Sequence, residues 1–175
     1  TRFPDIFLGI TTVYYLISTH PAFDKKLFTW INALRTKTRS GVVTPFRFID
    51  LRVPLAQMRL IKSPEEIEAM KMAAEISARA HIQAMKRCRI GMHEYDLEGV
   101  LLREFYRSGS RYPAYPSIVA GGNNACILHY TKNNALLKEN ELVLIDAGAE
   151  YDYYASDITR TFPVGGTFTS EQQAI

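Results

Sequence analysis

The N-terminal third of the chain contains one strand pattern and one helical pattern. Apolar and aromatic residues dominate 11–17 (TTVYYLI), which predicts a buried strand. Residues 21–34 (PAFDKKLFTWINAL) place their apolar side chains on one side of a helix, with Pro21 in the first turn. The pattern of 46–58 is ambiguous and favours a short helix. Because so few elements cannot bury a sufficient core, we expect this part to be the tail of a larger α/β unit.

Two longer helical patterns follow. Residues 63–66 (SPEE) have the spacing of a capping box, with proline at the first helical position, so a helix is predicted from Ser63 to about Lys86. His81 falls on the apolar side of this helix, where a hydrogen-bonded core histidine is the favoured interpretation. A second helix is predicted over 93–108 and is ended by Gly109.

The last long pattern, over 141–163 (ELVLIDAGAEYDYYASDITRTFP), predicts two strands joined by a tight turn. The first strand is an apolar run, and the returning strand is rich in aromatic and β-branched residues. If the turn is centred between Tyr151 and Asp152, Asp146 directly faces Asp157 across the hairpin. Side chains directly opposite in an antiparallel pair lie about 4.5–5.5 Å apart at Cβ.

Two carboxylates that face each other are destabilising unless a cation compensates their charge. Metal ions that share bridging ligands lie about 3.5–4 Å apart, a distance that two facing carboxylates can span. The hairpin therefore predicts a metal site. In the alternative, one aspartate belongs to the turn and the other is solvated, and a one-residue bulge would also undo the pairing. The spacing alone does not decide between a metal site and this alternative.

Composition narrows the class of protein. Hydrophobic residues make up 47% of the chain, which argues against global disorder. No apolar run approaches the ~20 residues of a membrane span, so no membrane association is expected. The two cysteines, Cys88 and Cys126, are too few for a disulfide framework and favour a cytoplasmic protein.

Charge is unevenly distributed along the sequence. Residues 1–62 carry ten Lys and Arg against three Asp and Glu, whereas residues 63–175 carry eleven against fifteen. This change of sign indicates a domain boundary. The basic residues are scattered and no DNA- or RNA-binding motif accompanies them, so no nucleic-acid partner is expected.

Five stretches of the sequence resemble the aminopeptidase P branch of the pita-bread metallopeptidases. The strongest is IDAGAEYDYYASDITRTFP, and the others are RLIKSPEEIEAM, GMHEYDLEG, YPAYP and ILHYTKN. The resemblance is strong over 58–175 and loose over 1–57. It implies an α/β (α+β) fold, with 1–57 as the C-terminal part of an N-terminal creatinase/prolidase-like domain. Residues 58–175 would then be the first half of the pita-bread catalytic domain.

The resemblance also implies roles for particular residues. Asp146 and Asp157 match two ligands of a dinuclear centre that usually holds Mn²⁺. His129 matches a histidine near the metals that helps to bind substrate and to stabilise the reaction intermediate. Tyr115 matches a tyrosine near the metals, and Thr159 is assigned to the substrate-binding surroundings.

The implied activity is removal of an N-terminal residue that precedes proline, so the implied partners are peptides with proline at the second position. The complete enzyme is expected to be a homo-oligomer. The family ligands come in the order Asp, Asp, His, Glu, Glu, but after Asp157 this chain has no histidine and one acid, Glu171. We therefore expect an interior fragment that is inactive alone. A prolidase acting on dipeptides and a non-catalytic pita-bread binding module are the alternatives.

Overall fold

The computed structural model describes residues 3–37 and 41–174, and contacts divide the chain into two units, Thr1–Lys62 and Ser63–Ile175. The division coincides with the change in the sign of the charge. The boundary expected between residues 57 and 58 falls within helix α2 (Arg52–Leu60). None of the helices in these described ranges combines the length and the apolar character that crossing a bilayer requires.

The first unit packs one long helix against a pair of parallel strands. Strand β1 (Thr12–Tyr14) pairs with β2 (Arg47–Ile49), and the 3-10 helix η1 (Phe3–Phe7) precedes them. Helix α1 (Pro21–Arg35) confirms the helix predicted over 21–34. The core of this unit is formed by Phe7, Leu27, Ile31 and Leu34.

The helix predicted over 46–58 is wrong in its first half. Residues Arg47–Ile49 form β2 instead, and the helix begins only at Arg52. Pairing explains the difference, because Phe48 lies opposite Val13 of β1 and both side chains pack against the buried face of α1. The strand predicted over 11–17 is confirmed only over Thr12–Tyr14, and the prediction that it is buried is wrong, because Thr12 and Val13 are half-buried and Tyr14 is exposed.

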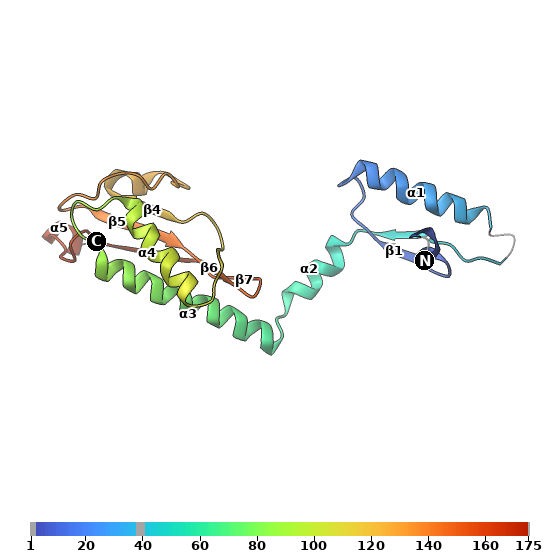
Figure 1. Cartoon of the computed structure of the whole chain (residues 1–175), viewed down its shortest axis with the longest axis horizontal. Coiled ribbons are helices and arrows are strands. Elements are labelled where there is room, and N and C mark those ends of the chain that lie inside the picture. Colours follow the sequence, from blue (N-terminus) through green and yellow to red (C-terminus); the bar gives the residue numbers. More distant parts are fainter. Residues whose placement is uncertain (1–2, 38–40, 175) are drawn as a thin grey trace. The chain divides into compact units, whose positions relative to one another are not determined.

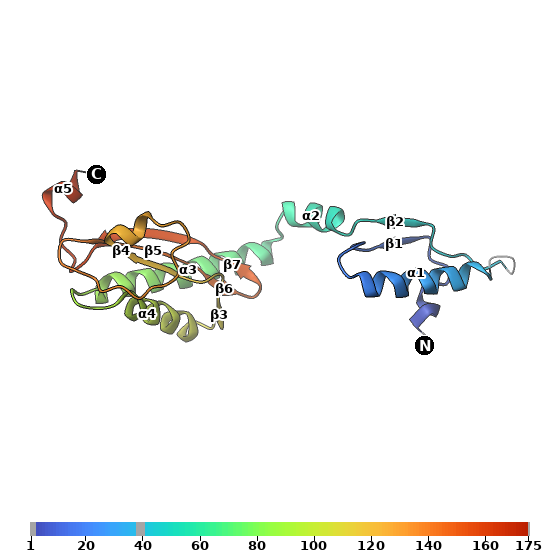
Figure 2. The same ribbon diagram turned by 90° about the horizontal axis from the view of Figure 1, so that it is seen from above.

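Two helices cover one face of the second unit (Figures 1 and 2). Helix α3 (Pro64–Arg87) begins with the predicted capping box, in which the Glu66 N–H donates to Ser63 Oγ at 3.3 Å. Helix α4 (Glu94–Arg107) begins after His93, whose backbone N–H donates to Asp96 Oδ2 at 2.8 Å. Both predicted helices are confirmed.

The strands of this unit form two antiparallel sheets of three strands. The larger has the order β4 (Ile118–Gly121), β5 (Leu142–Ala147), β8 (Ile158–Pro163). The smaller has the order β3 (Tyr112–Pro113), β6 (Ala149–Tyr151), β7 (Tyr154–Ala155). The 3-10 helix η3 (Gly122–Cys126) follows β4, and the short helix α5 (Ser170–Gln173) follows β8.

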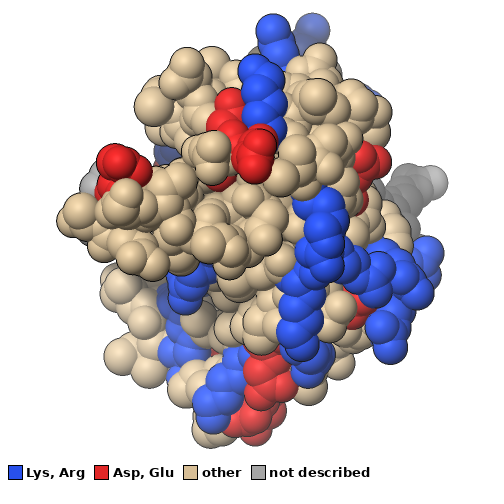
Figure 3. All heavy atoms as spheres, turned by 90° about the vertical axis from the view of Figure 1, so that its left-hand side faces the viewer, with Lys and Arg blue, Asp and Glu red and all other residues tan. Residues whose placement is uncertain are grey.

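The side chains of strand β5 point alternately to the core and to the opposite face of the sheet. Val143, Ile145 and Ala147 are buried and belong to the core formed with α3 and α4. Because side chains alternate along a strand, Asp146 lies on the face away from these helices. Figure 3 shows one face of the molecule, on which Lys and Arg gather in groups and some of them lie beside Asp and Glu.

Candidate metal centre

Strands β5 and β8 are the two arms of the predicted hairpin, but their register differs from the predicted one. Asp146 lies opposite Thr159. The turn is therefore centred between Asp152 and Tyr153, whose φ angles of 47° and 68° both lie in the left-handed region, as in a type I′ turn. The predicted centre one residue earlier is wrong, and so is the direct pairing of Asp146 with Asp157.

The two aspartates nevertheless share a face of the hairpin. Moving the turn by one residue moves the register by two, and side chains alternate with a period of two. Asp157 is therefore the diagonal neighbour of Asp146 and stays on its side of the sheet. Asp157 also lies in the break between β7 and β8, outside the regular ladder.

The two arms approach closely at this break. A Cβ added to Gly148 would lie 1.7 Å from the backbone oxygen of Ser156, so a residue with a side chain cannot occupy the position without moving the backbone. The same Cβ would lie 3.1 Å from the ring of Tyr115. Glycine is required here because the backbone of the returning strand and the ring of Tyr115 both lie too close to position 148 to leave room for a side chain.

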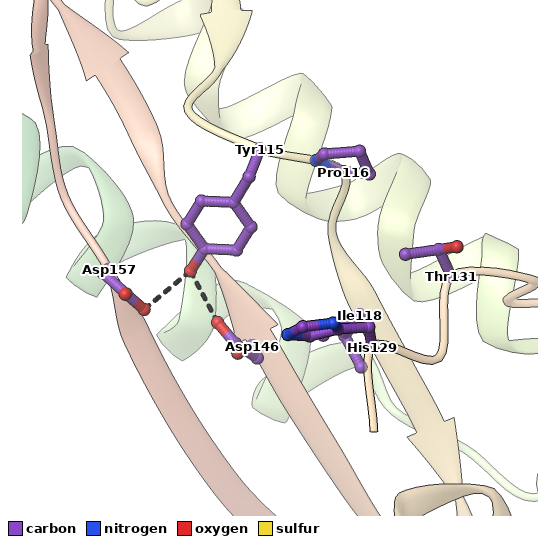
Figure 4. Close-up of a pocket in the computed structure, with 7 residues that line it drawn as sticks. All are labelled: Tyr115, Pro116, Ile118, His129, Thr131, Asp146 and Asp157. Carbon is purple, nitrogen blue, oxygen red and sulfur yellow. Dashed lines mark hydrogen bonds between the residues drawn. The ribbon is translucent and has the colours of Figure 1, made fainter. Parts of the chain in front are cut away.

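The hydroxyl of Tyr115 joins the two carboxylates (Figure 4). It lies 2.5 Å from Asp146 Oδ1 and 2.8 Å from Asp157 Oδ1, and both aspartates accept hydrogen bonds from it. Burial raises the pKa of Tyr115 far above its ordinary value, and the hydrogen bonds and charges of the two carboxylates raise it further. The phenol therefore stays protonated and serves as the shared donor. These contacts confirm that the carboxylates converge.

A pocket of about 460 Å³ surrounds this pair, and His129 lines it from another side. Figure 4 shows the imidazole directed into the same pocket as the two carboxylates. His129 is exposed, has a left-handed φ of 55° and lies in a turn after η3 rather than in a strand. Pro116, Ile118 and Thr131 complete the lining of the pocket.

Thr159 does not line this pocket, although it lies directly opposite Asp146 in the sheet. His81 lies outside the site. It is buried, and its Nδ1 lies 2.9 Å from the Ser77 carbonyl oxygen, which confirms the interpretation as a hydrogen-bonded core histidine.

A ring of buried hydrogen bonds fixes the break in the ladder from the helix side. Ser77 Oγ of α3 lies 2.7 Å from Ser156 Oγ, and the Ala149 N–H donates to Ser77 Oγ at 2.8 Å. Ser156 Oγ in turn donates to the Ala149 carbonyl oxygen at 3.0 Å. If Ser77 donates to Ser156, every group in the ring is satisfied. Since Ser156 precedes Asp157, helix α3 holds the backbone that carries this carboxylate.

The donors present fit part of a metal site. Paired carboxylate oxygens are hard ligands, which divalent ions such as Mn²⁺ and Mg²⁺ prefer. Within residues 3–37 and 41–174, no group of three or more His, Cys, Asp and Glu side chains is placed to hold a metal ion. Asp146 and Asp157 can therefore supply two ligands of a larger set.

Two buried residues with several hydrogen bonds were not singled out from the sequence, Ser77 and Glu94. Ser77 belongs to the small-residue face of α3, where its pattern is that of ordinary packing. Glu94 is completely buried at the start of α4, although an acid in a first helical turn usually lies in solvent. Glu94 lies within the motif GMHEYDLEG, but the resemblance of this motif assigned no role to the acid.

Comparison with known proteins assigns the family. The family model described as metallopeptidase family M24 matches residues 68–175. The Xaa-Pro aminopeptidase of Escherichia coli is 48% identical over 95% of this chain, and that of Haemophilus influenzae is 45% identical over 100%. The chain spans 38% of the length of each of these relatives.

Solved structures agree with this assignment. Pseudomonas aeruginosa aminopeptidase PepP superposes with a TM-score of 0.91 at 52% identity, covering 99% of this chain and 39% of that one. A zinc-substituted Escherichia coli aminopeptidase P in complex with product gives 0.90 at 46% identity, with 99% and 40% covered. The chain belongs to metallopeptidase family M24. The predicted α/β pita-bread fold is confirmed, and family membership implies a metal cofactor.

Proposed function

We propose that the complete protein containing this chain is an Xaa-Pro aminopeptidase, in which Asp146 and Asp157 are two of the metal ligands. The observation that carries this proposal is the convergence of both carboxylates on one hydroxyl, in a pocket that His129 also lines. Relatives with the name Xaa-Pro aminopeptidase support the reaction class. The substrates would be peptides with proline at the second position.

We infer that Mn²⁺ is the native metal, with two ions in the complete enzyme. The hard oxygen donors of the aspartates suit this ion. The chemistry that such ions supply when bound is acidification of water and polarisation of the scissile carbonyl. The 175-residue chain by itself would lack three of the five ligands and would be inactive.

His129 would act on the substrate rather than on the metals. Its ring has no hydrogen-bond partner among the described residues and is directed into the pocket. An imidazole N–H there can donate to the carbonyl oxygen of the scissile bond as negative charge develops on it. Tyr115 would hold the two aspartates in position from the opposite side. Thr159, directly opposite Asp146, would contribute to the surroundings of the substrate.

We further propose a cytoplasmic homo-oligomer. The location is supported by the two cysteines, both of which are free thiols. The oligomer is carried over from the family resemblance alone and is tested by the mass of the complete protein in solution.

Two substitutions in the complete protein test the assignment. His129→Ala should retain both metal ions and lose about 10²–10³-fold in kcat, because one donor to the developing charge is removed. Asp157→Ala should lose metal as well as rate. Metal content, melting temperature and kcat on an Xaa-Pro peptide are measured for both variants.

The same measurements expose the alternatives. If His129→Ala keeps a near wild-type kcat, the catalytic role of His129 is wrong. If Asp157→Ala keeps its full metal content, the ligand assignment is wrong. Comparing a dipeptide with longer Xaa-Pro peptides distinguishes an aminopeptidase from a prolidase, and a metal-free, inactive wild-type protein would indicate a binding module.

A further inference from the structure

Glu94 is a completely buried carboxylate that accepts four hydrogen bonds. Its Oε1 accepts from the Gly121 N–H at 2.8 Å and from Asn124 Nδ2 at 3.0 Å. Its Oε2 accepts from the Tyr130 hydroxyl at 2.7 Å and from the Ala135 N–H at 2.9 Å. All four donors come from outside α4, so the carboxylate connects this helix to another part of the chain.

The carboxylate remains ionised although no Lys or Arg of the described ranges forms a salt bridge with it. Burial raises the pKa of Glu94, but the hydrogen bonds from Gly121, Asn124, Ala135 and Tyr130 outweigh burial, so the pKa lies below its ordinary value. The position at the first residue of α4 adds the favourable field of a helix N-terminus. A buried charge satisfied in this way is costly to disturb.

The four donors lie on both sides of the segment that carries His129. Gly121 ends β4 and Asn124 lies in η3, before the histidine, whereas Tyr130 follows it directly and Ala135 comes five residues later. We call residues 122–136 the His129 loop. Outside η3 the only regular backbone pairing of this loop among the described residues is at its end, where Leu136 forms a β-bridge with His93.

Backbone contacts reinforce the connection at the end of the loop. The Glu94 N–H donates to the Ala135 carbonyl oxygen at 3.0 Å, which complements the bond from the Ala135 N–H to the Glu94 side chain. Asn133 adds a second anchor, because its side chain bonds the Val119 N–H and the Ser117 carbonyl oxygen, both at 2.9 Å. The tip of the loop, residues 126–129, is exposed and precedes both of these anchors in sequence.

We propose that Glu94 is a positioning residue for His129: it holds the His129 loop in the place where the imidazole reaches the pocket. This inference rests on the role proposed for His129 above. Glu94 does not line the pocket and so does not itself contact a substrate there. It acts through the four donors that surround the histidine in sequence.

Glutamine is the informative replacement. Each oxygen of Glu94 accepts from one backbone N–H, which can only donate, so whichever way a carboxamide is turned, its NH₂ group faces the N–H of Gly121 or of Ala135. Glu94→Gln therefore keeps the size of the side chain and breaks its connection to one end of the loop. Glu98→Gln, on the same helix but only half-buried, is the matched control.

The experiment is a double-mutant cycle in the complete protein with its metal. Glu94→Gln should lower kcat by about 10²-fold, the cost of a misplacement of about 1 Å, with the metal content unchanged. In the His129→Ala background it should cause no further loss in kcat, while lowering the melting temperature equally in both backgrounds. Hydrogen exchange of residues 122–136 should become faster in Glu94→Gln and not in Glu98→Gln.

An equal kcat loss in both backgrounds, or unchanged exchange of the loop, would overturn the proposal. If Glu94→Gln does not fold, Tyr130→Phe removes one donor and should give a smaller kcat loss that also vanishes in the His129→Ala background. If His129→Ala alone keeps the wild-type kcat, the proposed function of His129 fails. Faster exchange in Glu94→Gln would then show that Glu94 positions the loop for another purpose.

Discussion

One phenol proton is shared by two carboxylates at the centre of the pocket. Tyr115 has a single O–H to donate, yet its oxygen lies 2.5 and 2.8 Å from Asp146 and Asp157. The hydroxyl thus reduces the electrostatic repulsion between the two carboxylates, as a cation bound between them would. The motif YPAYP placed this tyrosine near the site, but no spacing rule could show that it touches both aspartates.

Replacing this hydroxyl should therefore matter most when metal is absent. Tyr115→Phe in the complete protein should lower the free energy of unfolding by about 1 kcal/mol in the presence of a chelator, the value of an ordinary hydrogen bond. With saturating Mn²⁺ the loss should shrink, because ions bound as proposed would hold the two carboxylates together. Melting temperatures under both conditions measure this, with the exposed Tyr112→Phe as control. An equal loss in both conditions would argue against convergence on a common ion.

At the scale of elements, the sequence predicted the faces of the hairpin correctly and its register incorrectly. Type I′ turns favour Asn-Gly or Asp-Gly, and the Asp152–Tyr153 turn lacks the glycine, so the sequence contained no signal for its centre. The error was harmless to the site because the register moved by two residues, which returns each side chain to the same face. A displacement by one residue would have separated the aspartates.

The buried serines show what a periodic pattern cannot predict. The spacing of apolar residues identified the inner face of α3, but it could not show that Ser77 on that face bonds Ser156 and Ala149. Such contacts depend on how the helix packs on the hairpin, which is a long-range property of the fold. The same holds for Glu94, whose donors lie 27 to 41 residues away in sequence.

Removing one hydroxyl of this ring should destabilise the hairpin modestly. In Ser77→Ala, the Ala149 N–H can still donate to Ser156 Oγ at 3.1 Å, so we expect a loss of about 1 kcal/mol in the free energy of unfolding. Ser117→Ala is the matched control, because Ser117 Oγ is buried without a hydrogen-bond partner and its removal should cost less. Denaturant unfolding measures the free energy of unfolding of both variants. If Ser77→Ala loses no more than Ser117→Ala, the role of the ring is refuted.

For the whole molecule, short sequence motifs predicted the class of fold better than the secondary-structure propensities of single elements did. The resemblance identified the metallopeptidase family, and the match of the family model to residues 68–175 confirms it. In contrast, strands β3, β6 and β7 are too short to produce a periodic pattern in the sequence. The change of charge at residue 62 marked the division into two units. Each unit has its own hydrophobic core. The two units can therefore differ in the sign of their charge, because neither depends on the other for its buried surface.

The proposed ligand set gives a prediction for the 175-residue chain alone, since it places two of five ligands in this chain. Two carboxylates without further ligands in the described residues should bind Mn²⁺ more weakly than the complete protein, and no Xaa-Pro peptide should be hydrolysed. Calorimetric titration with Mn²⁺ and a peptidase assay on a mass-verified chain test both parts. Asp146→Asn combined with Asp157→Asn is the control and should abolish the remaining binding. Rapid turnover by the wild-type chain would show that the two aspartates suffice, and the proposed requirement for three further ligands would be wrong.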